Sequence, residues 1–342
     1  MIFEKILNAG HIGIFTHMSP DGDALGSTFA LAGWLKQSNR KFTVFLPSPI
    51  SESLSFMLPA CMEKHIVLWK DSDSTDGLEK LSGCDLLIGL DFNNVSRIGG
   101  WEAAFRAAPA VKILVDHHMF PEENAFDTVI SRTDISSASE LLYSLLKQAP
   151  GINGDVSRLN AVTRESLLTG MTTDTNNFAN SVYPSTLAMA SELIAAGTDR
   201  DSIIQKLFFS YPERRIKAQG YILDKLLRLT PEGVAYIFLD SRTQTRLDLQ
   251  EGDTEGFVNI ALSMERIRMS ILAKRERGTD KIRISIRSKK GTSARECAAE
   301  YFHGGGHELA SGGKLVIGTD IASEKDVCGY IQNTARKFFM ER

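Results

Sequence analysis

The sequence predicts an α/β fold in which a domain with a mainly parallel sheet is followed by a smaller α+β domain. Two observations support this prediction. Short apolar runs alternate with helical patterns through the first half of the chain, as is typical of βαβ units and a parallel sheet. The chain also has 342 residues, which is long for one typical domain and suits two. We therefore expect a first domain over residues 1–230 and a second over residues 231–342.

The first domain is expected to contain four buried strands with helices between and after them. Compact apolar runs predict strands at residues 12–15, 42–46, 86–90 and 113–115. Helical patterns cover residues 23–37, 139–148 and 155–170, and three further helices follow at 184–196, 199–209 and 212–229. No strand is expected among these last three helices. Exposed apolar surface on them could support a homodimer.

The second domain shows a different order of elements, as expected for an α+β domain. Strands are predicted at residues 234–239, 268–274, 281–287 and 314–317, and helices at 257–264, 294–302 and 323–339. The boundary near residue 230 marks the change from consecutive helices to strands. This change in pattern predicts a separate core for the second domain.

Composition excludes several classes of protein. With 43% hydrophobic and 24% charged residues, the chain resembles ordinary globular proteins. No apolar run approaches the roughly 18 residues of a membrane helix, and the first residues lack the features of a signal peptide. The cysteines are scattered without a CxxC pair, which indicates reduced thiols: Cys61, Cys84, Cys297 and Cys328. We therefore expect a cytoplasmic protein without a membrane partner.

The formal net charge of −3 does not indicate a general nucleic-acid binder. However, the segment from Glu265 to Arg295 contains 11 Lys or Arg residues and only three Asp or Glu residues. Two interpretations stay open. These cations could be the solvated face of two surface strands, or they could hold an anionic substrate through its phosphates.

Acidic and histidine residues follow three of the predicted strands. They are His17, Asp21 and Asp23 after the first strand, Asp91 after the third, and Asp116, His117 and His118 after the fourth. Carboxyl ends of parallel strands meet at one edge of a sheet, so we expect these side chains to meet as well. Each cluster alone could be a helix cap or a structural turn. Together, carboxylates and imidazoles suit manganese, magnesium or zinc.

Two further motifs carry polar groups. Asp174 is expected in a polar loop that follows the helix ending near residue 170. Near the other end, Gly304, Gly305 and Gly306 lie between His303 and His307, and a helix is expected to start there. Exposed amides at a helix start would bind an anion, although a flexible turn would have the same composition. Arg287 and Ser288 end a nearby predicted strand and could face the same phosphate.

The order of these motifs resembles the DHH phosphoesterase superfamily with its DHH-associated C-terminal domain. The resemblance covers essentially the whole chain and is greatest to the bifunctional oligoribonucleases and pAp phosphatases, also called nanoRNases. The chain departs from the family in two loops. At the position of Asn176, family members often have glycine. Where this chain has His303 followed by three glycines, they often have four glycines. Both departures leave the expected ligands intact and concern loops next to the substrate.

The resemblance implies a site for two manganese ions, for which magnesium or cobalt could substitute. His17 and Asp21 would hold one ion, and Asp23, His117 and Asp174 the other. Asp91 would bridge them and take part in catalysis, with Asp116 and His118 next to the scissile phosphate. The implied substrate-binding residues lie in the second domain: Arg287, Ser288, Gly304, Gly305, Gly306 and His307.

The activity implied by the resemblance is hydrolysis of short single-stranded RNA to nucleoside 5′-monophosphates, of pAp to AMP, or of both, by water activated between two metals. Three alternatives remain. One is a family II inorganic pyrophosphatase, which shares the first motifs. Another is a phosphodiesterase for linear or cyclic dinucleotides such as pApA and c-di-AMP. The third is a nucleic-acid-binding module with a degraded metal site, which the presence of every expected ligand disfavours.

Overall fold

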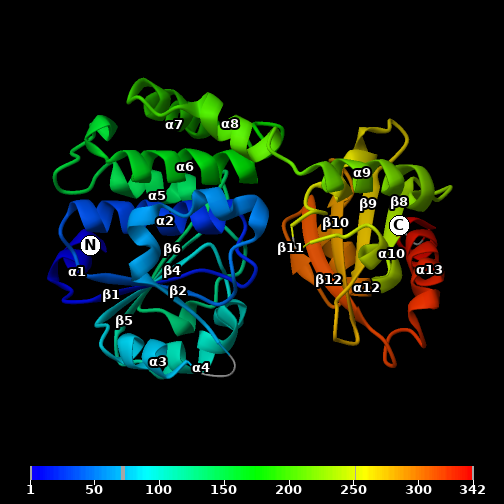
Figure 1. The fold of residues 1–342 in the computed structure, drawn as a ribbon, viewed down its shortest axis with the longest axis horizontal. Helices are drawn as coiled ribbons and strands as arrows, with labels where there is room; N and C mark the ends of the chain where they lie inside the picture. The colour runs from blue at the N-terminus through cyan, green and yellow to red at the C-terminus, as the bar shows by residue number, and fades with distance from the viewer. Residues whose placement is uncertain (1, 71–73, 251, 341–342) are drawn as a thin grey trace. The chain divides into compact units, whose positions relative to one another are not determined.

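The computed structural model describes residues 2–70, 74–250 and 252–340. It divides into two compact units, residues 1–210 and 211–342 (Figure 1). The division falls earlier than the boundary expected near residue 230. The reason is that helix α9 (Glu213–Tyr221) buries Ala218 in an apolar cluster with Ile237 and Leu272 of the second sheet. The helix therefore belongs to the core of the second unit.

The first unit is built on a six-stranded parallel sheet, which confirms the predicted α/β class. The strand order is β3-β2-β1-β4-β5-β6. The strands are β1 (Ile12–Phe15), β2 (Phe42–Leu46), β3 (Ile66–Leu68), β4 (Leu86–Leu90), β5 (Val111–Asp116) and β6 (Thr128–Ser131). All pairs are parallel. The connection changes direction between β1 and β4, and ligands of open α/β sheets usually bind at the carboxyl ends of the strands at such a position.

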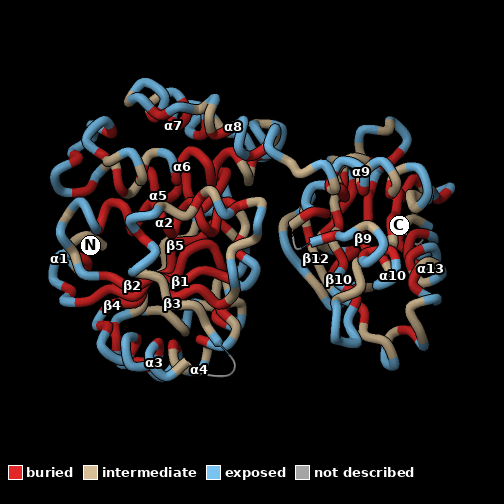
Figure 2. The backbone as a smooth tube through the Cα atoms, viewed as in Figure 1, coloured by how far each residue is buried: buried red, intermediate tan, exposed pale blue. Residues whose placement is uncertain are grey.

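Strands β3 and β6 were not predicted from the sequence. Both lie at the edges of the sheet and are only partly buried along their length. In contrast, β1, β2 and β4 are buried at every position, and Figure 2 shows them as largely buried segments. Burial on both faces produces the continuous apolar runs from which central strands are recognised. Edge strands lack that signal.

Helices cover both faces of the first sheet (Figure 1). On one face lie α2 (Gly22–Gln37), α5 (Ala138–Leu146) and α6 (Ala161–Asp174), and on the other α3 (Thr75–Ser82) and α4 (Glu102–Ala107). Outside α6 lie α7 (Pro184–Ala195) and α8 (Arg200–Phe208), and α1 (Ile2–Asn8) begins the described chain. Short 3₁₀ helices span Glu52–Met57, Ala60–His65, Val95–Trp101, Glu123–Ala125 and Val156–Arg158. No helix among the described residues is long and apolar enough to cross a membrane.

Helix α6 differs from its predicted range at both ends. It begins at Ala161 rather than at residue 155, because the side chain of Asn160 caps it by accepting a hydrogen bond from the N–H of Thr163. It also continues to Asp174. The expectation that Asp174 lies in a loop after the helix was therefore wrong. This carboxylate is held by the last turn of a packed helix.

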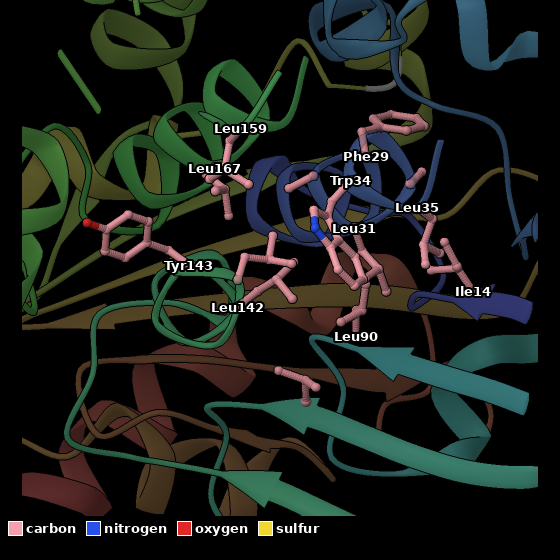
Figure 3. Packing of buried hydrophobic residues seen from close by; sticks show 14 of the residues in the cluster. Ile14, Phe29, Leu31, Trp34, Leu35, Leu90, Leu142, Tyr143, Leu159 and Leu167 are labelled. Atoms are coloured by element: carbon pink, nitrogen blue, oxygen red, sulfur yellow. The ribbon is translucent and has the colours of Figure 1, made fainter. Parts of the chain in front are cut away.

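Helix α2 is the centre of the first unit's core. It is apolar around nearly its whole circumference, as expected for a helix enclosed between a sheet and other helices. Phe29, Trp34 and Leu35 are almost completely buried, and Figure 3 shows Leu35 near Ile14 and Trp34 near Leu90 of the sheet. The start of α2, which carries the candidate ligands Asp21 and Asp23, is therefore fixed by the core.

A contact between two glycines brings α2 and α6 unusually close. A Cβ atom on Gly26 would lie 2.6 Å from the Cα of Gly170 and 2.7 Å from the carbonyl oxygen of Ser166. A Cβ atom on Gly170 would lie 2.1 Å from the Oγ of Ser139 in α5. Only glycine allows the three helices to approach in this way. The contact fixes the start of α2 relative to the end of α6.

The second unit contains a six-stranded mixed sheet in the order β11-β12-β10-β9-β8-β7. The strands are β7 (Arg228–Leu229), β8 (Val234–Leu239), β9 (Met269–Arg275), β10 (Lys281–Ser288), β11 (Gly305–Gly306) and β12 (Ala310–Val316). Strands β8 and β9 are parallel, and the other pairs are antiparallel. Its helices are α9, α10 (Ser241–Arg246), α11 (Phe257–Ile260), α12 (Ala294–Tyr301) and α13 (Val327–Met340), with 3₁₀ helices at Ala261–Ser263 and Glu324–Asp326.

Two predicted helices of this region have different structures. The helix expected at residues 212–229 ends in a π-helical turn (Ile222–Leu226) and is followed by β7. No helix starts at the three glycines. Instead, Gly305 and Gly306 form β11, which pairs with β12. The prediction of a helix start at these glycines was therefore wrong, and so was the geometry predicted for the anion site. Gly305 and Gly306 are nevertheless exposed.

Replacing Gly26 with alanine is expected to destabilise the first unit by about 1–3 kcal/mol, because the new methyl group has no space between α2 and α6. Thermal or urea unfolding of the variant measures this change. Gly329→Ala provides the matched control, since Gly329 lies in α13 and a Cβ atom there meets nothing within 4 Å. The control should be neutral or up to about 1 kcal/mol more stable. Equal stability of both variants would contradict the proposed close contact.

Candidate metal centre

The acidic and histidine clusters of the first unit meet at the carboxyl edge of β1, β4 and β5, and Asp91 lies between the others. Its Oδ2 atom is 3.7 Å from Nε2 of His17, and its Oδ1 atom is 3.5 Å from Nε2 of His117. Asp91 is 2% exposed, and its Oδ1 atom is buried without a hydrogen-bond partner. These separations are at or beyond the upper limit for a hydrogen bond. One carboxylate therefore faces two imidazoles from different strands.

The backbone of Asp91 is itself unusual. Its φ angle is +62°, in the left-handed region that residues with a Cβ atom seldom adopt. Its N–H donates a hydrogen bond to the carbonyl oxygen of Val115 at the end of the neighbouring strand β5. The strained turn thus follows β4 directly and is held by β5. Strain of this kind is concentrated at functional sites.

His17 and Asp21 form the first group around Asp91. Asp21 caps α2, since its Oδ1 atom accepts hydrogen bonds from the N–H groups of Asp23 and Ala24. Its Oδ2 atom lies 3.8 Å from Nε2 of His17. The Nδ1 atom of His17 is 2.8 Å from the carbonyl oxygen of Met18, which can only accept. This contact assigns the proton to Nδ1, so the lone pair of Nε2 faces the carboxylates.

Asp23, His117 and Asp174 form the second group. The Nε2 atom of His117 lies 3.9 Å from Oδ2 of Asp23 and 3.6 Å from Oδ2 of Asp174. Asp23 is 1% exposed, whereas the side chain of Asp174 is 31% exposed. Asp91 contacts His117 as well, so it is shared by both groups. The two sets of oxygen and nitrogen donors are of the kind that binds divalent cations.

Asp23 is oriented by a feature that the sequence analysis did not identify. Its two carboxylate oxygens accept hydrogen bonds from the N–H groups of Ala138 and Ser139, at 2.6 and 2.9 Å. These amides belong to the first turn of α5, where the helix dipole favours a negative charge. A sequence signal was present, because Ser137 and Glu140 have the Ser-x-x-Glu spacing of a helix start. This signal predicts a helix start but does not reveal which carboxylate accepts hydrogen bonds from its first amides.

The electrostatics of the site reflect buried negative charge. Burial, together with the nearby carboxylates of Asp91 and Asp174, raises the pKa of Asp23 well above its ordinary value. Burial also acts to raise the pKa of Asp91, but His117 and His17 outweigh it and hold that pKa well below the ordinary value. Burial is likewise the main cause that raises the pKa of Asp174 to about 6. Bound divalent cations would offset this concentration of carboxylates, so the residues fit a metal centre.

Asp116 and His118 lie beside the two groups. The Nδ1 atom of His118 is 2.7 Å from Oδ1 of Asp116 and 3.6 Å from Oδ1 of Asp91. Asp116 is completely buried, and its Oδ2 atom has no hydrogen-bond partner. Asp116 therefore orients the imidazole of His118 rather than facing solvent itself. The ring of His118 is 16% exposed, so it can meet a ligand at this edge.

The predicted substrate-binding residues of the second unit gather at one end of its sheet. Arg287 pairs with Ala310 in the ladder between β10 and β12, and the N–H of Ser288 donates to the carbonyl oxygen of Leu309. The Ser288 hydroxyl is buried and donates to the carbonyl oxygen of Thr292. These contacts bring the end of β10 next to the turn that connects β11 and β12.

The glycine segment itself is a close contact between two strands. A Cβ atom on Gly304 would lie 1.9 Å from the carbonyl oxygen of Gly312, so only glycine fits there. Gly305 and Gly306 pair with Gly312 and Ser311, and the N–H of His307 donates to the carbonyl oxygen of Ala310. The exposed backbone of this segment is thus held in a fixed hairpin.

Both departures from the family pattern occur at left-handed backbone positions. The φ angle is +46° at Asn176 and +48° at His303. Glycine adopts this region freely, and asparagine is the residue with a Cβ atom that tolerates it best. Asn176 follows Thr175, the C-cap of α6, and begins a run of left-handed residues that includes Phe178. His303 is paired with Asp320 at 2.8 Å. The substitutions therefore keep the loop conformation that glycine would allow.

Asn176→Ala is expected to lower the stability of the protein by about 1 kcal/mol, because alanine has neither the freedom of glycine nor the local hydrogen bonding of asparagine in this region. Asn176→Gly should stay close to the wild type. Asn180→Ala is the matched control, since Asn180 lies in the same loop without a positive φ angle. Thermal unfolding of the three variants tests the assignment, and an unchanged midpoint for Asn176→Ala would contradict it.

Comparison with known proteins gives a consistent result. Residues 11–171 match the DHH family, N-terminal domain, and residues 233–322 match the DHHA1 domain. The crystal structure of an exopolyphosphatase-related protein from Bacteroides fragilis superimposes with a TM-score of 0.87 at 31% sequence identity. That alignment covers 98% of this chain and 95% of the other.

Two curated relatives align with this chain over most of their lengths. The bifunctional oligoribonuclease and PAP phosphatase NrnA of Thermus thermophilus is 29% identical over 90% of this chain and 84% of its own length. The NrnA protein of Bacillus subtilis, which carries the same name, is 27% identical over 87% of both chains. These similarities confirm the resemblance inferred from the motifs. The chain therefore belongs to the DHH family, and it is a phosphoesterase with an N-terminal DHH domain and a C-terminal DHHA1 domain.

Proposed function

We propose that this phosphoesterase uses two divalent metal ions to hydrolyse short single-stranded RNA to nucleoside 5′-monophosphates and pAp to AMP. The main support is the position of Asp91, whose two oxygens face His17 on one side and His117 on the other, at 3.7 and 3.5 Å. The names of the two NrnA relatives support the choice of substrates. The metal-binding and catalytic roles given below are part of the proposal.

In this proposal His17 and Asp21 hold one ion, while Asp23, His117 and Asp174 hold the other. Asp91, which lies in both groups, would be shared by the two ions. Manganese is the expected metal, with magnesium or cobalt as substitutes, because mixed carboxylate and imidazole donors suit these ions. When bound, the two ions supply a water molecule of lowered pKa and stabilise negative charge on the phosphate. The partnerless buried Oδ1 atom of Asp91 is consistent with this role.

His118 is proposed to stabilise the negative charge that develops on the phosphoryl oxygens. Asp116 accepts a hydrogen bond from Nδ1 of His118 and so fixes the orientation of the ring. The Nε2 atom, on the opposite edge of the ring, is then directed away from Asp116. The free edge of the ring is the part that could meet a phosphoryl oxygen. Asp116 thus acts through His118.

The second domain is proposed to hold the terminal nucleotide. Arg287 offers a guanidinium group that can bind a phosphate through two parallel hydrogen bonds. Gly305 and Gly306 are exposed, so a ligand could reach the surface of this hairpin. Ser288 and Gly304 shape the hairpin that presents them, and His307 ends it. A short substrate is proposed because the NrnA relatives are named oligoribonucleases.

Other phosphate esters and anhydrides remain alternatives within the same chemistry. They include pApA, c-di-AMP and pyrophosphate, and the name of the Bacteroides relative adds polyphosphate. These substrates differ in whether they contain a nucleobase and a free terminal phosphate. Their rates of hydrolysis by the purified protein distinguish these substrates.

Asp91→Asn is expected to reduce kcat/KM for pAp by at least about 1,000-fold, equivalent to about 4 kcal/mol. The amide keeps the size of the side chain but removes the charge that both ions would share. Metal content after dialysis and the rise of the melting temperature with added manganese should fall as well.

The control for this variant is Asp134→Asn. Asp134 is 72% exposed and forms an ion pair with Arg132, so its loss should leave activity and metal binding unchanged. An Asp91→Asn enzyme that keeps normal turnover in manganese would refute the two-metal proposal.

A substrate panel tests the proposed specificity. It contains pAp, RNAs of two to five nucleotides, pApA, c-di-AMP, pyrophosphate, tripolyphosphate and a long RNA, each with manganese. We expect rapid hydrolysis of pAp and the shortest RNAs, and little hydrolysis of the long RNA. Activity confined to pyrophosphate or tripolyphosphate would overturn the nucleotide assignment, and activity confined to dinucleotides would narrow it.

A further inference from the structure

An exposed phenylalanine lies next to the candidate metal centre. The side chain of Phe120 is 75% exposed, which is unusual for a large apolar residue. Phe120 follows His118 by two positions. Consecutive Cα atoms are 3.8 Å apart, so the Cα atoms of these two residues are separated by no more than about 7.6 Å. The backbone of Phe120 is thus close to the proposed position of the scissile phosphate.

The backbone of Phe120 is strained. Its φ angle is +58°, in the left-handed region where a residue with a Cβ atom pays a steric cost. Burial of the ring cannot offset this cost, because the ring lies mostly in solvent. Strained residues without a structural benefit of their own are concentrated in binding and catalytic loops. This combination indicates that Phe120 has a partner outside the fold.

The loop that carries Phe120 is held firmly on the loop that carries Asp91. The Nδ2 atom of Asn93 donates a hydrogen bond of 2.8 Å to the carbonyl oxygen of Met119, and the N–H of Glu122 donates one of 2.7 Å to the carbonyl oxygen of Asn93. Glu122 also accepts from the N–H of Val95 and pairs with Arg106 at 2.7 Å. Phe120 is therefore presented from an anchored segment.

Two exposed methionines are neighbours of site residues in the sequence. Met119 is 37% exposed, and Met18, which follows His17, is 51% exposed. Methionine side chains adapt their shape and make favourable contacts with aromatic rings. The site therefore combines a charged floor of carboxylates and imidazoles with exposed apolar side chains at its edge. A matching ligand has a phosphate at one end and a flat aromatic group at the other.

We propose that Phe120 is a stacking platform for the nucleobase of the substrate and that Met18 and Met119 complete it. The proposal rests on the proposed function and adds a specificity-determining residue to it. Stacking on an aromatic side chain accepts any base, because every base has a π face. It favours nucleotides over phosphates that have no base, and it does not select among base sequences.

Binding of AMP and of ribose 5-phosphate to the manganese-loaded protein isolates this effect. The two ligands share the phosphate and the sugar, and only AMP carries a base. Titration calorimetry should show that the wild type binds AMP more tightly, and that Phe120→Ala weakens AMP binding by about 10- to 100-fold, as expected for the loss of one stacked base. Binding of ribose 5-phosphate should not change, and Phe120→Trp should restore the preference for AMP.

Two further variants complete the design. Phe209→Ala is the matched control, since Phe209 is 77% exposed in the same unit and lies after α8. It should leave both ligands unaffected. Phe120→Asn repeats the removal of the ring with a residue that tolerates a left-handed backbone. It should have the same effect as Phe120→Ala with an unchanged melting temperature.

Each outcome decides the proposal. Equal AMP binding by Phe120→Ala and Phe209→Ala would overturn the platform, and so would a wild type that binds ribose 5-phosphate as tightly as AMP. Loss of the AMP preference in Phe120→Ala would support it even if the wild type hydrolysed no nucleotide in the substrate panel. In that case the proposed function would fail while the base-binding role of Phe120 would stand.

Discussion

The shared position of the Asp91 carboxylate is the constraint on which the site depends. Asp91 follows the central strand β4, with β1 on one side and β5 on the other, and each neighbour contributes histidines that face it. Its left-handed backbone turns the carboxylate into this position, and a hydrogen bond to β5 holds it there. Since parallel strands end at one edge, the three clusters meet without a long loop. The fold therefore concentrates ionisable groups where an apolar core ends.

Such a concentration of carboxylates requires support from the surrounding helices. The amides at the start of α5 hold Asp23, and the last turn of α6 holds Asp174. The contact between Gly26 and Gly170 brings α2 and α6 close enough for Asp23 and Asp174 to reach the same imidazole. The stability of the core and the geometry of the site are thus linked, because the same helices supply both. Bound cations would then relieve repulsion that the apo protein must tolerate.

The substrate class follows from two different kinds of surface. Carboxylates and imidazoles suit cations and, through them, a phosphate group, but they do not distinguish a nucleotide from pyrophosphate. Phe120 and its neighbouring methionines could make this distinction, because only a nucleotide has an aromatic ring to stack. His118, which is proposed to stabilise the phosphate, and Phe120, which is proposed to bind the base, would thus lie in one loop that runs from His117 to Glu122. Phosphate contacts through Arg287 and the glycine hairpin of the DHHA1 domain are part of the proposal.

The sequence by itself determined the central strands and the candidate ligands, because strands buried on both faces produce continuous apolar runs and polar residues at their ends stand out. It did not determine edge strands β3 and β6, the extension of α6 to Asp174, or the hairpin at Gly305, whose signals are weak or resemble those of other elements. Only the tertiary structure decided that α5 binds Asp23, since those groups are 115 residues apart along the chain and only packing of the helices brings them together.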